Sequence, residues 1–123
     1  MSKVFVHVMP NYMPEESSSE KQRFVFSYTV SITNETLHQV QLLSRHWIIT
    51  NGETLKTQEV RGDGVIGQKP IIQPGESYTY TSGTVMESPV GTMQGFYTMQ
   101  DHEGAFFDVE IPVFTLAVTH SVH

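Results

Sequence analysis

The chain has 123 residues, enough for one domain, and it contains no cysteine, which excludes disulfides and cysteine-ligated zinc or iron–sulfur sites. Lys and Arg total 7 while Asp and Glu total 13, giving a net charge of -6 that argues against binding to nucleic-acid phosphates. Charged residues make up only 16% of the chain and aromatic residues reach 11%, so the composition indicates a folded domain.

The first two predicted strands alternate between apolar and polar residues. Val4, Val6 and Val8 alternate near the start of the chain, and Arg23–Thr33 has apolar residues at its even positions. This period of two is typical of strands with one face buried. The intervening segment Pro10–Gln22 is rich in Pro, Glu and Ser, and its composition predicts a solvated loop.

The third predicted strand covers Val40–Thr50 and has apolar residues on both faces, which favours a central position in a sheet. It contains the only tryptophan, Trp47, which resembles the core tryptophan of immunoglobulin-like domains. Asn51 and Gly52 follow and tolerate positive φ, so we expect a tight hairpin turn there. Thr54–Val60 is the expected hairpin partner.

The next segment, Arg61–Gly75, contains several glycines and prolines and is predicted to be a loop. Ile71 and Ile72 could form a short buried segment inside it. Alternation resumes in Glu76–Ser82, where Tyr78 and Tyr80 are expected to point inward.

The last two predicted strands flank a turn at Asp101–Gly104. The first covers Gly91–Gln100, and the second begins with an alternating segment, Phe107–Val113. After Pro112 the apolar phase shifts by one position, so that Phe114 and later residues continue the buried face. A phase shift at proline predicts a β-bulge or a strand that crosses between sheets.

These elements amount to about seven or eight strands and no helix, which predicts a single antiparallel β-sandwich or barrel spanning residues 1–123. No segment approaches the roughly 18 apolar residues that span a bilayer, and Met1–His7 lacks the apolar core of a signal peptide. We therefore expect a cytoplasmic protein with no membrane contact. No nucleophile lies in a recognisable catalytic pattern, so neither an enzyme nor a bound cofactor is expected.

A glycine motif lies in the predicted loop, where Gly62, Gly64 and Gly67 match G-x-G-x-x-G. Such glycines let backbone N–H groups approach a phosphate, although dinucleotide binding also needs a helix after the motif, and prolines follow here. Arg61 and Lys69 flank the motif and could attract a small anion. The alternatives are an inter-strand loop that needs glycine for positive φ, a small-anion site, and a dinucleotide site.

Histidines and carboxylates offer candidate metal ligands at two places. Asp101, His102 and Glu103 are consecutive in the last predicted turn, and His120 and His123 lie near the C-terminus. Histidine and carboxylates are common metal ligands, but adjacent residues in a turn rarely converge on one ion. A solvated acidic turn and a frayed chain end are the alternatives.

Several long blocks together resemble one protein family, and they occur in the family's order over nearly the whole chain. The blocks are Arg23–Val30, Gln41–Gly52, Val60–Gly67, Pro74–Glu76, Tyr80–Gly83, Gly91–Gly95 and Ile111–Leu116. They resemble the ApaG family, also called CorD, in its stand-alone bacterial form. The resemblance implies a fibronectin type III or immunoglobulin-like sandwich.

The resemblance also implies certain functions. The family is associated with cobalt tolerance and magnesium transport, and in multidomain relatives the domain mediates protein contacts. Its glycine motif, here Gly62, Gly64 and Gly67, is suggested to bind pyrophosphate or a nucleotide. We therefore expect a non-enzymatic interaction domain with a protein partner, with small-anion binding as the alternative. Self-association into a homodimer is a further expectation.

Overall fold

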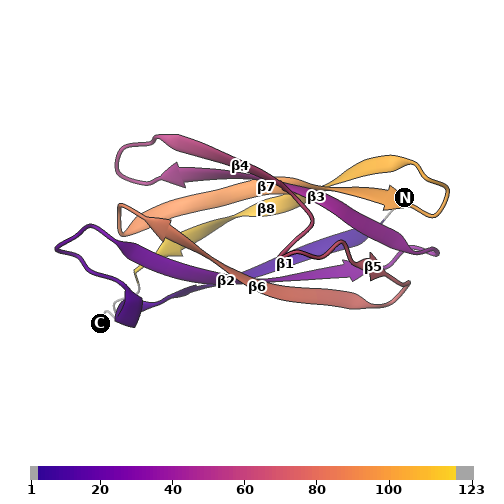
Figure 1. Ribbon diagram of the computed structural model, residues 1–123, viewed down its shortest axis with the longest axis horizontal. Coiled ribbons are helices and arrows are strands. Elements are labelled where there is room, and N and C mark those ends of the chain that lie inside the picture. The colour runs from indigo at the N-terminus through magenta and orange to yellow at the C-terminus, as the bar shows by residue number, and fades with distance from the viewer. Residues whose placement is uncertain (1–2, 119–123) are drawn as a thin grey trace.

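The computed structural model describes residues 3–118 and places eight strands in two facing sheets (Figure 1). The strands are β1 (Val4–Tyr12), β2 (Phe24–Asn34), β3 (Val40–Asn51), β4 (Thr57–Asp63), β5 (Ile71–Ile72), β6 (Ser77–Met86), β7 (Val90–Asp101) and β8 (Phe106–Ala117). A 3₁₀ turn at Pro14–Glu16 is the only helical element among the described residues. Within them, no helix has the length and apolar character needed to cross a membrane.

The sheets have the orders β1-β2-β6 and β4-β3-β7-β8, and β5 pairs with the start of β3. Every pairing is antiparallel. The expected immunoglobulin or fibronectin type III-like sandwich is thereby confirmed, and the central position of the third strand is confirmed because β3 lies between β4 and β7.

Aromatic side chains at the inward-facing positions of the strands form the centre of the core. Trp47 is 2% exposed and contacts Tyr28, Tyr97 and Phe114 edge-on, with ring centroids 5.4 to 6.3 Å from its own. Aromatic rings in such arrangements bury large apolar areas. The interior is therefore held by packing around Trp47, in a chain that has no disulfide.

Two buried tyrosines join the sheets through their hydroxyl groups. Tyr80 of β6 and Tyr97 of β7 hydrogen-bond to each other inside the sandwich. Burial raises the pKa of Tyr80 to about 12 and raises the pKa of Tyr97 well above its usual range, because the interior disfavours the phenolate. Both hydroxyls thus remain protonated and available as hydrogen-bond donors over the physiological pH range.

A fully buried amide ties the end of β2 to the segments around it. The Nδ2 of Asn34 donates to the carbonyl oxygens of His38 and Ile72, both at 2.9 Å. Its Oδ1 accepts from the amide and the hydroxyl of Thr36. Asn34 is 0% exposed, so these bonds satisfy a polar group that would otherwise be costly to bury.

The phase shift predicted in the last strand is a β-bulge in β8. Met93 of β7 faces Phe114, whereas Gly95 faces Ile111, so β8 has one more residue than β7 between these pairs. The extra residue lies at Pro112–Val113. It turns Phe114 inward, where its ring contacts Trp47 and Tyr28.

The predicted tight turn at Asn51–Gly52 is wrong. The β3–β4 connection runs from Gly52 to Lys56, and its positive φ, 64°, lies at Leu55. The longer loop is stabilised because Asn51 Oδ1 accepts the amides of Glu53 and Thr54. Gly52 is required for another reason, since a Cβ there would lie 2.7 Å from the carbonyl oxygen of Val90.

Other boundaries also differ from the expectations. The first strand continues to Tyr12, inside the predicted loop Pro10–Gln22, and the partner of β3 is Thr57–Asp63 rather than Thr54–Val60. Ile72 is buried as predicted at 2% exposure, but Ile71 is 50% exposed because only one face of β5 meets the core.

Candidate functional site

The segment that carries the glycine motif begins in a strand, not in a loop. Arg61, Gly62 and Asp63 belong to β4 and pair with residues of β3 in a regular antiparallel register. The predicted loop Arg61–Gly75 therefore starts at Gly64. The segment between β4 and β5 is a short turn without a helix, so the strand–helix geometry of dinucleotide sites is not formed.

Gly62 and Gly64 allow two close approaches in this segment. The guanidinium of Arg45 lies over Gly62, where a Cβ would be 2.7 Å from its Cζ, and Arg45 Nη1 donates to the carbonyl of Gly64 at 2.7 Å. Gly64 has a φ of 62°, and a Cβ there would lie 2.2 Å from the carbonyl oxygen of Gln68. Gly64 is therefore required by its own backbone, whereas a side chain at Gly62 would only have to displace the flexible end of Arg45.

Gly67 lies in a two-residue turn. Val65 and Gln68 exchange both backbone hydrogen bonds, at 2.8 and 2.9 Å, across Ile66 and Gly67. Both central residues have positive φ, 41° and 76°, as a type I′ turn requires. The amides of Val65 and Gln68 are consequently engaged inside the turn and do not point toward a ligand.

The two cations that flank the motif are arranged differently. Lys69 is exposed. A Cβ placed on Gly64 would lie 3.3 Å from the Cγ of Lys69, so the aliphatic part of the lysine side chain lies beside Gly64. Arg61 projects from β4, with 72% of its side chain exposed. The structure therefore places Arg61 beside Gly62 and Lys69 beside Gly64, with Gly67 at the tip of the turn.

An open hollow of about 510 Å³ lies on the outer face of the β4-β3-β7-β8 sheet. Its centre is formed by His46 of β3 and Phe96 of β7, which are direct cross-strand neighbours with ring centroids 4.9 Å apart. Arg61 and Gly62 line one side of it, next to Asp63. Two of the predicted anion-site residues therefore border a hollow that also contains an aromatic side chain.

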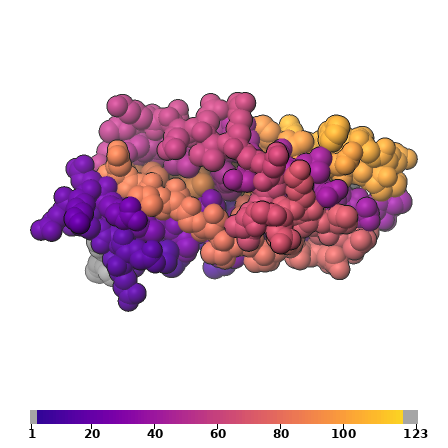
Figure 2. All heavy atoms as spheres, viewed as in Figure 1, coloured from indigo at the N-terminus to yellow at the C-terminus, as the bar shows by residue number. Residues whose placement is uncertain are grey.

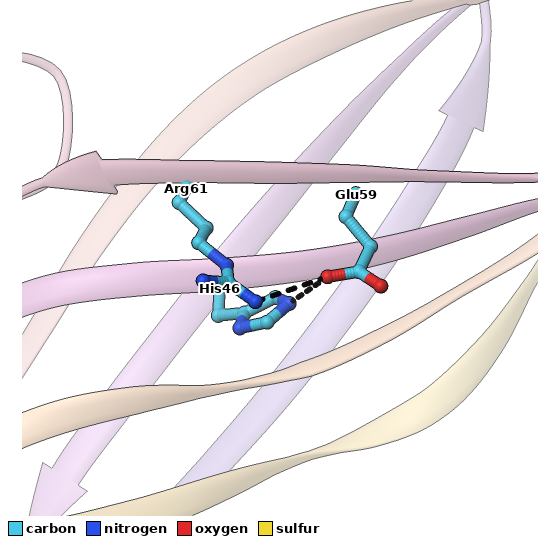
Figure 3. A network of polar contacts seen from close by, with 3 residues as sticks. All are labelled: His46, Glu59 and Arg61. Atoms are coloured by element: carbon cyan, nitrogen blue, oxygen red, sulfur yellow. Dashed lines mark hydrogen bonds and ion pairs between the residues drawn. The ribbon is translucent and has the colours of Figure 1, made fainter.

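A polar network lies next to this hollow (Figure 3). Glu59 Oε1 lies 2.9 Å from His46 Nε2 and 3.3 Å from an Arg61 nitrogen. The hydrogen bond from His46, followed by that from Arg61, lowers the pKa of the Glu59 carboxyl. The carboxylate therefore compensates part of the positive charge that Arg61 brings to the hollow.

The candidate metal ligands of the β7–β8 turn point to different partners. Asp101 Oδ1 accepts the amides of Glu103 and Ala105, and the Ala105 amide is the main cause that lowers the Asp101 pKa. His102 stacks on His38 with ring centroids 3.8 Å apart. Glu103 Oε2 is 3.9 Å from His102 Nε2.

Metal binding at this turn stays a prediction. In residues 3–118, no three His, Cys, Asp or Glu side chains are grouped so that they could hold an ion. The other predicted ligands, His120 and His123, lie outside the described residues.

Sequence reasoning missed Phe96 and His38, and it placed Glu59 only among the acidic residues near the cations of the glycine motif. Phe96 lies beside His46 because of the register between β3 and β7, and Glu59 lies near it because of the register between β3 and β4. The β3–β7 register shifts at a bulge beside Leu43. The charge alternation of Glu59 and Arg61 is visible in the sequence and could have indicated an exposed strand face. No sequence signal places His38 on His102, because the two belong to separate loops.

Comparison with known proteins identifies the family. The family model of the ApaG domain matches residues 14–101. The chain is 50% identical over 121 residues to protein ApaG of Pectobacterium carotovorum, covering 98% of this chain and 96% of the relative. It is 53% identical over 120 residues to protein ApaG of Pseudomonas aeruginosa, covering 98% and 94%.

A solved structure agrees with this relationship. The crystal structure of a Bordetella pertussis protein described as ApaA superposes with a TM-score of 0.93 at 48% identity, covering 98% of this chain and 97% of that one. The sequence blocks, the sandwich and these relatives all lead to one assignment. The chain belongs to the ApaG family.

Proposed function

We propose that this chain is a non-enzymatic interaction domain that binds a protein partner through the outer-face hollow. The observation that carries the proposal is the pairing of an aromatic residue and an arginine, Phe96 and Arg61, in one open hollow. Aromatic and arginine side chains dominate the binding energy of many protein interfaces. Asp63 lines the hollow and Glu59 lies beside Arg61, so both carboxylates provide hydrogen-bond acceptors at the rim of the hollow.

Binding suits this hollow better than chemistry. Electrostatic catalysis is most effective in sites that exclude water, whereas this hollow is open on a sheet face. His46 is the one histidine among residues 3–118 that lines it, and it is already paired with Glu59. The proposal therefore assigns His46 and Glu59 to holding Arg61 and Phe96 in place.

Affinity capture from the native cell, followed by mass spectrometry, tests the proposal. We expect the unaltered chain to recover a defined protein that Phe96→Ala and Arg61→Ala lose, because each removes a central contact worth about 2 kcal/mol or more. Thr29→Ala, which alters the outer face of the other sheet, is the matched control and should recover the same protein. Identical recovery by all four chains would contradict the proposal.

Small-anion binding at Gly62–Gly67 is the second candidate. What supports it is the position of the two cations, since Arg61 is largely exposed beside Gly62 and the stem of Lys69 lies beside Gly64. Pyrophosphate or a nucleotide phosphate is the expected ligand class. In this candidate the side-chain cations carry the binding, because the Val65 and Gln68 amides of the turn donate to each other's carbonyl oxygens.

Calorimetric titration with pyrophosphate tests this candidate. The double variant Arg61→Gln and Lys69→Gln should weaken binding by at least about tenfold, since two charge-assisted contacts are removed. Lys21→Gln, an exposed site in the β1–β2 connection, is the matched control and should bind like the unaltered chain. A Gly64 variant is unsuitable, because any Cβ there collides with the Gln68 carbonyl. No heat at millimolar pyrophosphate would remove the candidate.

The cytoplasmic location and the association with cobalt and magnesium remain expectations that the resemblance and the composition suggest. The interaction proposal requires no bound metal. It attributes any effect of divalent cations on the cell to the partner that the domain binds.

A further inference from the structure

The C-terminal half of β6 is an unpaired sheet edge. β6 pairs with β2 alone, and no backbone hydrogen bond joins Ser77–Met86 to another described segment. Along Thr81–Met86, every second residue is exposed, including Val85 at 51%. In Figure 2 the orange atoms around the end of β6 lie next to the magenta atoms of the β3–β4 hairpin on one face of the molecule.

The other outer strands carry features that discourage strand pairing, and β6 does not. β1 contains Pro10, β4 contains three charged residues, and β8 contains two carboxylates, Pro112 and the bulge. Charges, prolines and bulges are the devices by which natural sheets protect their edges. In β6 there is no charged residue and no proline, and its register with β2 is unbroken.

A groove of about 380 Å³ lies beside this edge. Met86 and Glu87 line it from the end of β6, while Ile49 of β3 and the residues Lys56–Gln58 at the start of β4 line it from the other sheet. A strand added next to β6 would therefore have this groove as a floor for its inward side chains at the Met86 end of the edge. Neither Lys56 nor Glu87 forms an ion pair with another described residue.

We propose that an extended segment of a partner protein adds to the β1-β2-β6 sheet alongside Thr81–Met86. The N–H and C=O groups along this edge alternate with the spacing of another extended main chain, which makes the occupant a peptide. Its inward side chains should include an apolar residue that reaches Met86 and Ile49. An acidic residue near Lys56 and a basic residue near Glu87 would complement the two unpaired charges of the groove.

A second copy of this chain fits the edge less well. Antiparallel pairing of two β6 strands places both copies' second sheets on the same side, and β4 already lines the groove beside β6. The second copy would bring its own β3 and β4 into that layer. A single extended segment avoids this overlap.

Selection of a random peptide library displayed on phage against the full chain tests the proposal. We expect the selected peptides to share an extended apolar segment flanked by opposite charges. Adding a selected peptide should slow amide hydrogen exchange in residues 81–86. Val85→Lys, which puts a charge on the exposed edge, and Lys56→Glu should each weaken binding by about tenfold.

Two controls separate this edge from other surfaces and from the proposed function. Phe96→Ala alters the outer-face hollow, and His7→Lys puts the same charge on the opposite edge strand; both should bind the peptides normally. Thermal unfolding checks that Val85→Lys and Lys56→Glu remain folded, as expected for exposed positions. A selection without binders, or binders that only Phe96→Ala or His7→Lys weakens, would overturn the strand-addition proposal while leaving the capture experiment intact.

Discussion

Replacing Trp47 by alanine is expected to lower the free energy of unfolding by about 4 kcal/mol, within the range measured for large buried aromatic residues. The indole is 2% exposed and lies among Tyr28, Tyr97 and Phe114, which come from different strands of both sheets. Truncation would remove these contacts and leave a cavity that the surrounding rings cannot close without shifting the sheets. A loss of this size is a large part of the total stability of a small domain.

Urea unfolding followed by circular dichroism measures this loss, because Trp47 is the only tryptophan and its fluorescence disappears in the variant. Trp47→Phe is the matched control and should lose clearly less, since it keeps an aromatic ring in the core. Equal stability of Trp47→Ala and the unaltered chain would show that the core does not depend on this ring.

Asn34→Asp is expected to lower the free energy of unfolding by at least about 3 kcal/mol at neutral pH, because it buries an uncompensated charge. The Nδ2 group of Asn34 donates to two carbonyl oxygens, and a carboxylate oxygen in its place would face both of them. Burial and these carbonyls would raise the pKa of the new carboxyl above the roughly 3.9 of an unfolded Asp.

The sign of the pH dependence follows from this raised pKa. Between the unfolded and the folded pKa the folded variant binds more protons than the unfolded chain, so its stability falls as the pH rises through that window. The deficit relative to the unaltered chain should thus be smaller at about pH 4 than at about pH 7.5. Urea unfolding at both pH values measures it.

Asn51→Asp provides the matched control for this substitution. The Oδ1 of Asn51 accepts hydrogen bonds from the amides of Glu53 and Thr54. A carboxylate oxygen can accept the same two bonds. We expect this variant to change stability little and without the same pH dependence. Similar losses in the two variants would indicate that charge alone, and not the donors of Asn34, determines the effect.

The fold could be predicted from the sequence because period-two alternation reflects burial directly. Trp47, Tyr80 and Tyr97 are buried where the alternation places them, and the phase shift after Pro112 is a bulge. Loop lengths could not be predicted, because they depend on side-chain contacts such as the two amides that Asn51 binds. A glycine-rich segment resembled a loop although Gly62 lies in a strand, under the guanidinium of Arg45.

The candidate site was predicted only in part. Arg61 and Gly62 were chosen from their position in a glycine motif and do border the outer-face hollow. Phe96 was not predicted, because its contact with His46 depends on the pairing of β3 with β7. Register between distant strands is set by three-dimensional packing, and the bulge beside Leu43 shifts it by one residue.

The pairing of β2 with β6 also determines how the chain must fold. The hydroxyls of Thr29 and Thr81 lie 2.9 Å apart although the residues are 52 positions apart in the sequence. A loop of that length has to close before the pair can form, and its closure entropy opposes the first contacts. Proteins dominated by such distant pairings fold more slowly than helical domains of similar size. Until β6 reaches β2, both edges of this uncharged strand are exposed to other nascent chains, so a slow closure increases its risk of aggregation.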